Sequence, residues 1–124
     1  MRRRTPTLTP QELEVMKIVW QKGEATVRDV YEILLERRKI AYTTVMTVMR
    51  ILEDKGHLSR RREDRAHIYR PTRSQEVVVR SMVREFVNRV FNGSAQPLLV
   101  HLVEDRQVSE QELDELARMI KESE

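Results

Sequence analysis

The chain of 124 residues contains no cysteine and only three glycines, and aromatic residues make up 5% of it. Without cysteine the protein can form neither disulfide bonds nor thiolate metal sites. No apolar stretch approaches the length of a membrane span, so we expect no membrane insertion and a cytoplasmic location. The sequence also lacks a glycine-rich phosphate loop, a nucleophile motif and histidines at metal-ligand spacing. We therefore predict no metal, no cofactor and no enzymatic activity.

The charge of the chain is divided unevenly. Up to Arg73 there are 17 Lys and Arg against 10 Asp and Glu, a net charge of +7, whereas from Ser74 onward the count is 6 against 10, a net charge of −4. A merely solvated surface explains a high charge content but not this split. A basic unit is attracted to a polyanion. We expect two domains, residues 1–73 and 74–124, of which the first binds the polyanion. Arg2, Arg3 and Arg4 could serve it as a phosphate-binding arm, or be an untethered tail.

Capping patterns predict two helices at the start of the chain. Thr9, Pro10 and Glu12 have the order of an N-cap, a first helical residue and the acid of a capping box. Thr26 and Asp29 repeat the capping pattern for a second helix. Apolar residues follow both starts at helical spacing, which is typical of helices that pack on a common core.

A third helix is expected from about Thr43 to Lys55, and it has two contrasting faces. Its core face consists of Val45, Val48, Met49 and Leu52. The opposite face carries short polar side chains and an arginine, where a solvated helix usually carries Glu, Lys and Gln. These residues are Thr43, Thr44, Thr47 and Arg50. Tyr42 precedes them, and it could either contact the sugar-phosphate edge of a nucleic acid or support the start of the helix. Such side chains can contact base edges and phosphates, and arginine can bind guanine bidentately.

An arginine-rich β-hairpin is predicted directly after this helix. Residues 58–62 and 66–70 can pair as two strands around a turn at residues 63–65. The hairpin carries the candidate phosphate contacts Arg60, Arg61, Arg62 and Arg65. The alternative is an ion-paired surface hairpin, and Glu63 and Asp64 at its tip could pair with these arginines. A polar helix followed by a basic hairpin indicates a winged helix-turn-helix that binds double-stranded DNA, within a mainly α fold that has a small β-hairpin.

The rest of the chain is predicted to be helical and too apolar to fold alone. Helices are expected from Ser74 to about Phe91, from Pro97 to Val103, and after Ser109. So small a unit cannot bury all three apolar stripes. We therefore predict a helical dimerisation region that packs against a second copy of itself. Its candidate contacts are Val83, Phe86, Val90, Phe91, Leu99, Leu102, Leu113, Leu116 and Ile120.

Three segments closely resemble a known family of regulators. LTPQELEVMKIVW, AYTTVMTVMRILEDKG and RAHIYRP are similar to the BlaI/MecI-type repressors, the penicillinase repressor family, which includes the copper-responsive CopY branch. The resemblance covers about residues 7 to 122. It implies a homodimer that binds inverted-repeat operators of antibiotic-response or metal-handling genes. It places residues 43, 44, 47 and 50 on the recognition helix and residues 60–65 on the wing.

The resemblance also implies how repression is relieved. In the β-lactam branch a membrane sensor metalloprotease triggers cleavage of an Asn-Phe bond in a dimerisation helix. The corresponding pair here is His101-Leu102, which differs on both sides of that bond. CopY-type members sense copper through C-terminal cysteines, and this chain has none. We expect relief when the C-terminal helices are cleaved or destabilised, with the inducing signal left open.

Two other functions are compatible with the residues. One is a ligand-responsive winged-helix regulator with an effector pocket in its helical region. The other is a winged helix used only for protein-protein contact, which should lack a steep dependence of binding on salt.

Overall fold

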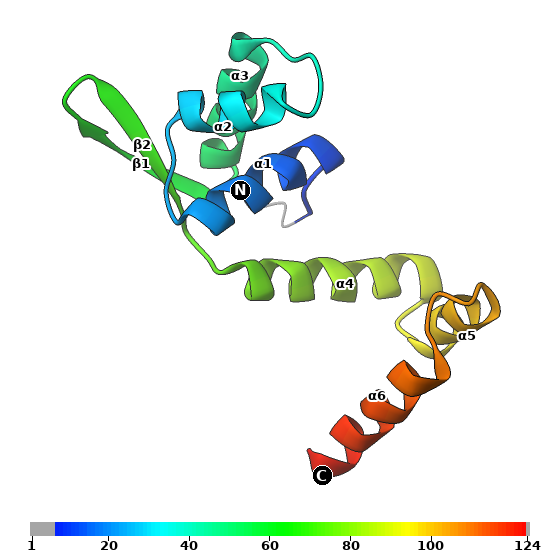
Figure 1. The fold of residues 1–124 in the computed structure, drawn as a ribbon. Coiled ribbons are helices and arrows are strands. Elements are labelled where there is room, and N and C mark those ends of the chain that lie inside the picture. Colours follow the sequence, from blue (N-terminus) through cyan, green and yellow to red (C-terminus); the bar gives the residue numbers. More distant parts are fainter. Residues whose placement is uncertain (1–6, 124) are drawn as a thin grey trace. The chain divides into compact units, whose positions relative to one another are not determined.

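The computed structural model describes residues 7–123, which form six helices and a two-stranded antiparallel sheet (Figure 1). This confirms the predicted mainly α fold with a small hairpin. In chain order the elements are α1 (Pro10–Lys22), α2 (Val27–Leu35), α3 (Tyr42–Asp54), β1 (Leu58–Glu63), β2 (Ala66–Pro71), α4 (Gln75–Phe91), α5 (Gln96–Glu104) and α6 (Glu110–Glu122). The chain divides into two compact units that meet inside α4, between Met82 and Val83.

Side-chain caps start three of the helices. The capping boxes are Thr9 with Glu12, Thr26 with Asp29, and Ser109 with Glu112. In each box the hydroxyl accepts a backbone N–H three residues on, and the acid accepts the N–H of the cap. By contrast α3 starts after Ala41, which offers no side-chain cap. Packing must therefore hold α3 in place, because its β-branched residues also lower its intrinsic helix propensity.

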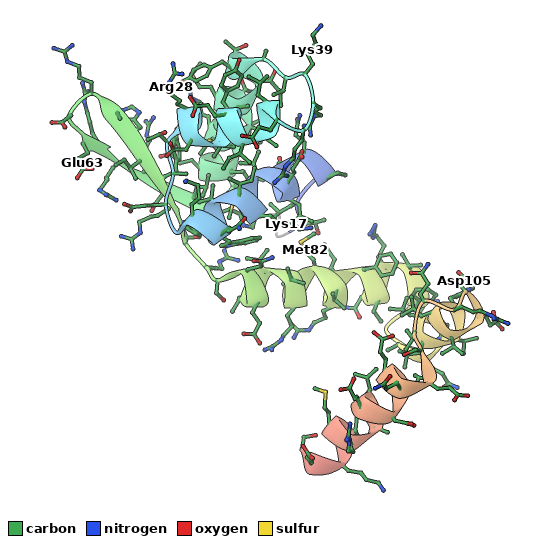
Figure 2. The ribbon with its side chains drawn as sticks, in the orientation of Figure 1. Lys17, Arg28, Lys39, Glu63, Met82 and Asp105 are labelled. Atoms are coloured by element: carbon green, nitrogen blue, oxygen red, sulfur yellow. The ribbon has the colours of Figure 1, made fainter. Side chains whose placement is uncertain are left out.

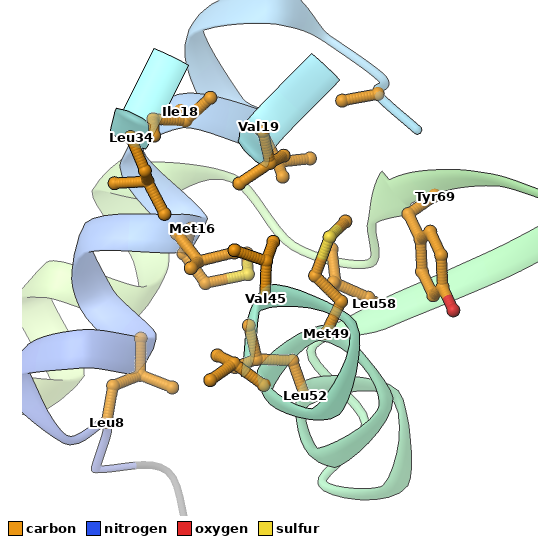
Figure 3. Close-up of a cluster of buried hydrophobic side chains, with 14 of the residues drawn as sticks. Leu8, Met16, Ile18, Val19, Leu34, Val45, Met49, Leu52, Leu58 and Tyr69 are labelled. Carbon is orange, nitrogen blue, oxygen red and sulfur yellow. The ribbon is translucent and has the colours of Figure 1, made fainter. Parts of the chain in front are cut away.

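One apolar core fills the first unit (Figure 3). The four predicted core positions of α3, residues 45, 48, 49 and 52, are all buried, and they pack with Met16 and Val19 of α1 and with Leu34 of α2. The start of α4 belongs to this core too, because Val78 is buried and Met82 packs against the cluster.

The hairpin turns over two residues rather than the predicted three. Glu63 pairs with Ala66, so Glu63 belongs to β1 and only Asp64 and Arg65 form the turn. Asp64 has φ of 56°, a left-handed conformation that aspartate tolerates better than most residues. At the base of the hairpin, the N–H and C=O of Ala25 bond to Tyr69 at 2.9 and 2.8 Å. This isolated bridge joins the hairpin to the connector between α1 and α2.

A largely buried ion pair connects the start of α1 to the end of α3. Glu12 is 6% exposed, and its Oε1 accepts hydrogen bonds from Lys55 Nζ at 2.8 Å and from Thr9 N at 3.0 Å. Burial by itself raises the pKa of the Glu12 carboxyl. The hydrogen bonds from Lys55 and Thr9 outweigh burial, so that pKa lies below its ordinary value. The carboxylate therefore stabilises the fold above pH 4.5, and this contribution is lost as the pH falls through the folded-state pKa.

Replacing Lys55 with Met is expected to lower the free energy of unfolding by about 1–2 kcal/mol at pH 7, because it leaves a buried carboxylate without its cation. The loss should be smaller at pH 4, below the ordinary pKa of 4.5, because part of the stabilisation by the Glu12 carboxylate has then been lost in the original protein. Urea denaturation at the two pH values measures both effects, and Lys17→Met on the exposed side of α1 is the control. An equal loss at both pH values would contradict this assignment.

The second unit has no buried core of its own. None of residues 83–123, all of which the structure describes, is buried. Phe91 contacts the rings of Phe86 and His101, with centroids 5.9 and 6.0 Å apart. The large apolar side chains that remain exposed are Val83, Phe86, Val90, Leu99, Val100, Val103, Leu116, Met119 and Ile120. Within residues 7–123, no helix is long and apolar enough to cross a membrane.

Candidate nucleic-acid-binding surface

The polar face of α3 is uncovered in the first unit. On this face Thr43, Thr47 and Arg50 are exposed, whereas Thr44 is half-buried. The sequence pattern missed Ile51, which is 39% exposed. It follows Thr47 by four residues, so it lies on the same side of the helix. Helical spacing from Thr47 could have revealed it. This face can offer methyl groups, hydroxyls and one guanidinium to the edges of bases.

Tyr42 supports the start of α3 and is also accessible. Its ring is 39% exposed and packs edge-on against Tyr31 of α2, with centroids 5.3 Å apart. Arg28 of α2 lies over the same ring, with its guanidinium carbon 6.0 Å from the centroid. Arg28, which is labelled in Figure 2, also pairs with Glu32 at 3.5 Å, and both side chains are solvated. The sequence did not point to Arg28, since only the folded helices bring it beside Tyr42.

The first two hairpin arginines are held by carboxylates of the protein. Arg60 Nε lies 3.3 Å from a carboxylate oxygen of Glu53 on α3, and its Nη1 lies 3.2 Å from His67 Nδ1. Arg61 makes two parallel hydrogen bonds to Glu24, at 2.9 and 3.2 Å, and lies 3.8 Å from Glu63. For these two residues the structure shows the ion-paired hairpin that the sequence left as an alternative.

Electrostatics agree with the geometry of the Arg61–Glu24 pair. The hydrogen bond from Arg61 holds the pKa of the Glu24 carboxyl below its ordinary value, and the nearby Arg70 acts in the same direction. The same bond raises the pKa of Arg61. Glu24 was not singled out in the sequence, because it precedes Arg61 by 37 residues and no local pattern connects them.

The other two candidate arginines of the hairpin are not neutralised. In the part of the chain that the structure describes, neither Arg62 nor Arg65 forms an ion pair. Arg62 Nε donates a hydrogen bond to the backbone oxygen of Asp64 at 3.3 Å, and both arginines are exposed at the tip of the hairpin. The tip projects away from the helices of the first unit (Figure 1). The basic segment Arg2–Arg4 lies outside the described residues. Residues 7–123 contain no group of acidic or histidine side chains that could hold a metal ion.

Comparison with known proteins identifies the kind of regulator to which this surface belongs. A sequence model of the penicillinase repressor family matches residues 8–122. The chain belongs to the penicillinase repressor family. This confirms the resemblance seen in the three sequence segments.

Individual relatives agree with this membership. The chain is 43% identical over 115 residues to the transcriptional regulator BlaI of Mycobacterium tuberculosis, covering 91% of this chain and 82% of that protein. It is 27% identical over 120 residues to the penicillinase repressor of Bacillus licheniformis, covering 97% and 94% of the two chains. The protein is therefore a transcriptional repressor and not an enzyme, as predicted.

A solved structure identifies the first unit. The solution structure of the DNA-binding domain of the repressor BlaI superposes with a TM-score of 0.53 and 28% sequence identity, over 60% of this chain and 90% of that domain. The predicted winged helix is thereby confirmed, and this repressor is a DNA-binding protein. Which side chains contact DNA remains a prediction that rests on the geometry of α3 and the hairpin.

Proposed function

We propose that this repressor binds a two-fold symmetric operator as a homodimer. In each subunit α3 enters the major groove and the hairpin lies along the neighbouring phosphates. The uncovered face of α3, with its two exposed threonines and Arg50, supports the contact with bases. Inverted-repeat operators suit this arrangement, because a two-fold dimer presents two identical recognition helices.

The main support for the proposed homodimer is that the second unit lacks a buried core across residues 83–123. Of the nine predicted dimerisation residues, six are exposed and three, Phe91, Leu102 and Leu113, are half-buried. A hollow of about 500 Å³ on α6 is lined by apolar Val108, Leu116 and Met119 and rimmed by charged side chains. So large an apolar surface is typical of a protein interface. A second copy of the same unit would cover it.

Dimerisation also supports a mechanism for relief of repression. A single subunit makes about half of the phosphate contacts of the dimer, so separation of the subunits weakens binding steeply at cellular salt. The candidate cleavage position, His101-Leu102, lies within α5, where His101 O accepts a hydrogen bond from Asp105 N at 3.0 Å. Local unfolding of α5 would have to precede cleavage there. We propose a membrane sensor metalloprotease as the source of that signal.

The test is selection of binding sites by the purified chain from a randomised DNA library, followed by titrations at several salt concentrations. We expect an inverted repeat bound by two subunits, with an affinity that falls steeply as salt rises. Binding that is weak and indifferent to sequence would favour the effector-dependent alternative. No binding at low salt would favour the protein-interaction alternative instead.

Arg50 is predicted to be the main base contact of α3. The variant Arg50→Ala should lower operator affinity by about 1–3 kcal/mol and relax the preference at one base pair of each half-site. Titration against the selected operator and against single-base variants of it measures both changes. Lys39→Ala, which removes an exposed cation from the connector before α3, is the control. Weaker binding without a relaxed preference would instead make Arg50 a phosphate contact.

A further inference from the structure

The hairpin presents two faces to different surroundings. Residues two apart on a strand, and residues paired across the ladder, lie on the same face. Arg60 therefore shares a face with its partner Tyr69 and with Leu58, both of which are buried against the core. Arg61 and its partner Ile68 lie on the opposite face. Neighbouring arginines on β1 thus point in opposite directions.

Each of these arginines is bound to a different part of the first unit. On the core-side face, Arg60 contacts Glu53 near the end of α3 at 3.3 Å. On the other face, Arg61 bonds to Glu24 of the connector between α1 and α2, with both carboxylate oxygens engaged. Bidentate pairs of this kind constrain direction as well as distance.

The two ion pairs lie where the hairpin leaves the body of the unit. The last backbone bonds between the hairpin and the helical body are those of Tyr69 with Ala25, among the residues that the structure describes. Beyond Arg60 and Arg61, residues 62–67 continue to the turn and back, and within the described chain none of them forms an ion pair with a helix. One tether on each face therefore acts against bending of the hairpin in either direction.

We propose that Arg61 is a positioning residue, which with Glu24 orients the hairpin for DNA, and that Arg62 and Arg65 make the phosphate contacts of the wing. This inference rests on the proposed function. The charge of Arg61 is already balanced by Glu24, so Arg61 releases no counterion from DNA. Among the described residues, Arg62 and Arg65 are not paired with a carboxylate of the protein, so they can neutralise phosphates and release counterions. Both members of the Arg61–Glu24 pair are partly solvated, so the tether biases the orientation of the hairpin and does not lock it.

The salt dependence of binding separates the two roles. The doubly neutral variant Glu24→Gln with Arg61→Gln keeps the net charge of the full chain. It should bind the selected operator about threefold more weakly with an unchanged salt slope, as expected for removal of an exposed ion pair. Exchange of the charges, Glu24→Arg with Arg61→Glu, should return the affinity to within about twofold of the original. Arg62→Gln should lower the slope by about 0.9 for each phosphate that the arginine neutralises in the original complex.

A matched control uses an ion pair that does not involve the hairpin. Arg80 lies 2.9 Å from Glu76 on α4, so Glu76→Gln with Arg80→Gln removes an exposed pair outside the hairpin and should leave DNA affinity unchanged. A smaller salt slope in the doubly neutral hairpin variant, without recovery on charge exchange, would make Arg61 a phosphate contact and overturn the proposal.

A second readout needs no DNA. The chain has no cysteine, so Lys39→Cys and Ala66→Cys place spin labels only on the connector before α3 and on the hairpin. With labelled chains diluted in unlabelled protein, the distance distribution should broaden in the doubly neutral variant and narrow again on charge exchange. Equal widths in all three proteins would overturn the proposal. If the original chain bound no DNA, the proposed function would fail while this measurement still judged the tether.

Discussion

Ending the chain after Met82 is expected to lower operator affinity at least a hundredfold while the first unit stays folded. The truncated chain keeps α1 to β2 and the part of α4 that packs on the core, including Val78. It lacks every predicted dimerisation residue. A monomer binds one half-site, and without the second, linked half-site the affinity typically falls by about 10² to 10⁴.

The measurement is an anisotropy titration of the full and truncated chains against the same operator at the same salt, with sedimentation to give the number of subunits. The control fuses residues 1–82 to an unrelated parallel coiled coil, which should restore much of the affinity by linking two units again. A monomeric truncated chain that bound as tightly as the full chain would contradict the dimer model of repression. Ending the chain at Arg73 is less suitable, because it also removes Val78 and Met82 from the core.

Replacing Leu52 with Ala is expected to lower the free energy of unfolding of the first unit by about 2–5 kcal/mol. Leu52 is 0% exposed on the core face of α3, so its truncation leaves a cavity and also removes buried apolar area. The effect should be large because α3 has no side-chain cap and depends on packing for its position. A domain of this size has a total stability of about 5–15 kcal/mol, so at the lower end of that range the loss would unfold a large share of the molecules and with them the DNA-binding surface.

Urea denaturation followed by Trp20 fluorescence measures this destabilisation in the first unit alone. Trp20 is the single tryptophan, and its Nε1 donates a hydrogen bond to Arg73 O at 2.9 Å. Protein concentration must be held constant, since a dimer couples folding to association. Leu35→Ala, at a side chain that is 45% exposed, is the matched control and should cost less than about 0.5 kcal/mol. Similar destabilisation in both variants would show that the core is not where we place it.

Local chemistry alone determined where four of the six described helices begin. Three capping boxes and the start of α4 after Ser74 depend on residues within three or four positions of each other, so they can be identified without the fold. The same holds for the two faces of α3, because a helical period assigns burial from spacing. The length of the hairpin turn was wrong by one residue, since the pairing of Glu63 with Ala66 depends on how the strands register.

Long-range contacts, however, decided which arginines are available to bind DNA. The four arginines at positions 60–65 form a single group in the sequence, yet the fold brings Glu53 to Arg60 and Glu24 to Arg61 and leaves Arg62 and Arg65 at the tip. Arg28 reaches Tyr42 only because α2 packs across α3. Charge and helical period are properties of the chain, whereas the pairing of charges distant in sequence exists only after tertiary packing has brought them within a few ångströms.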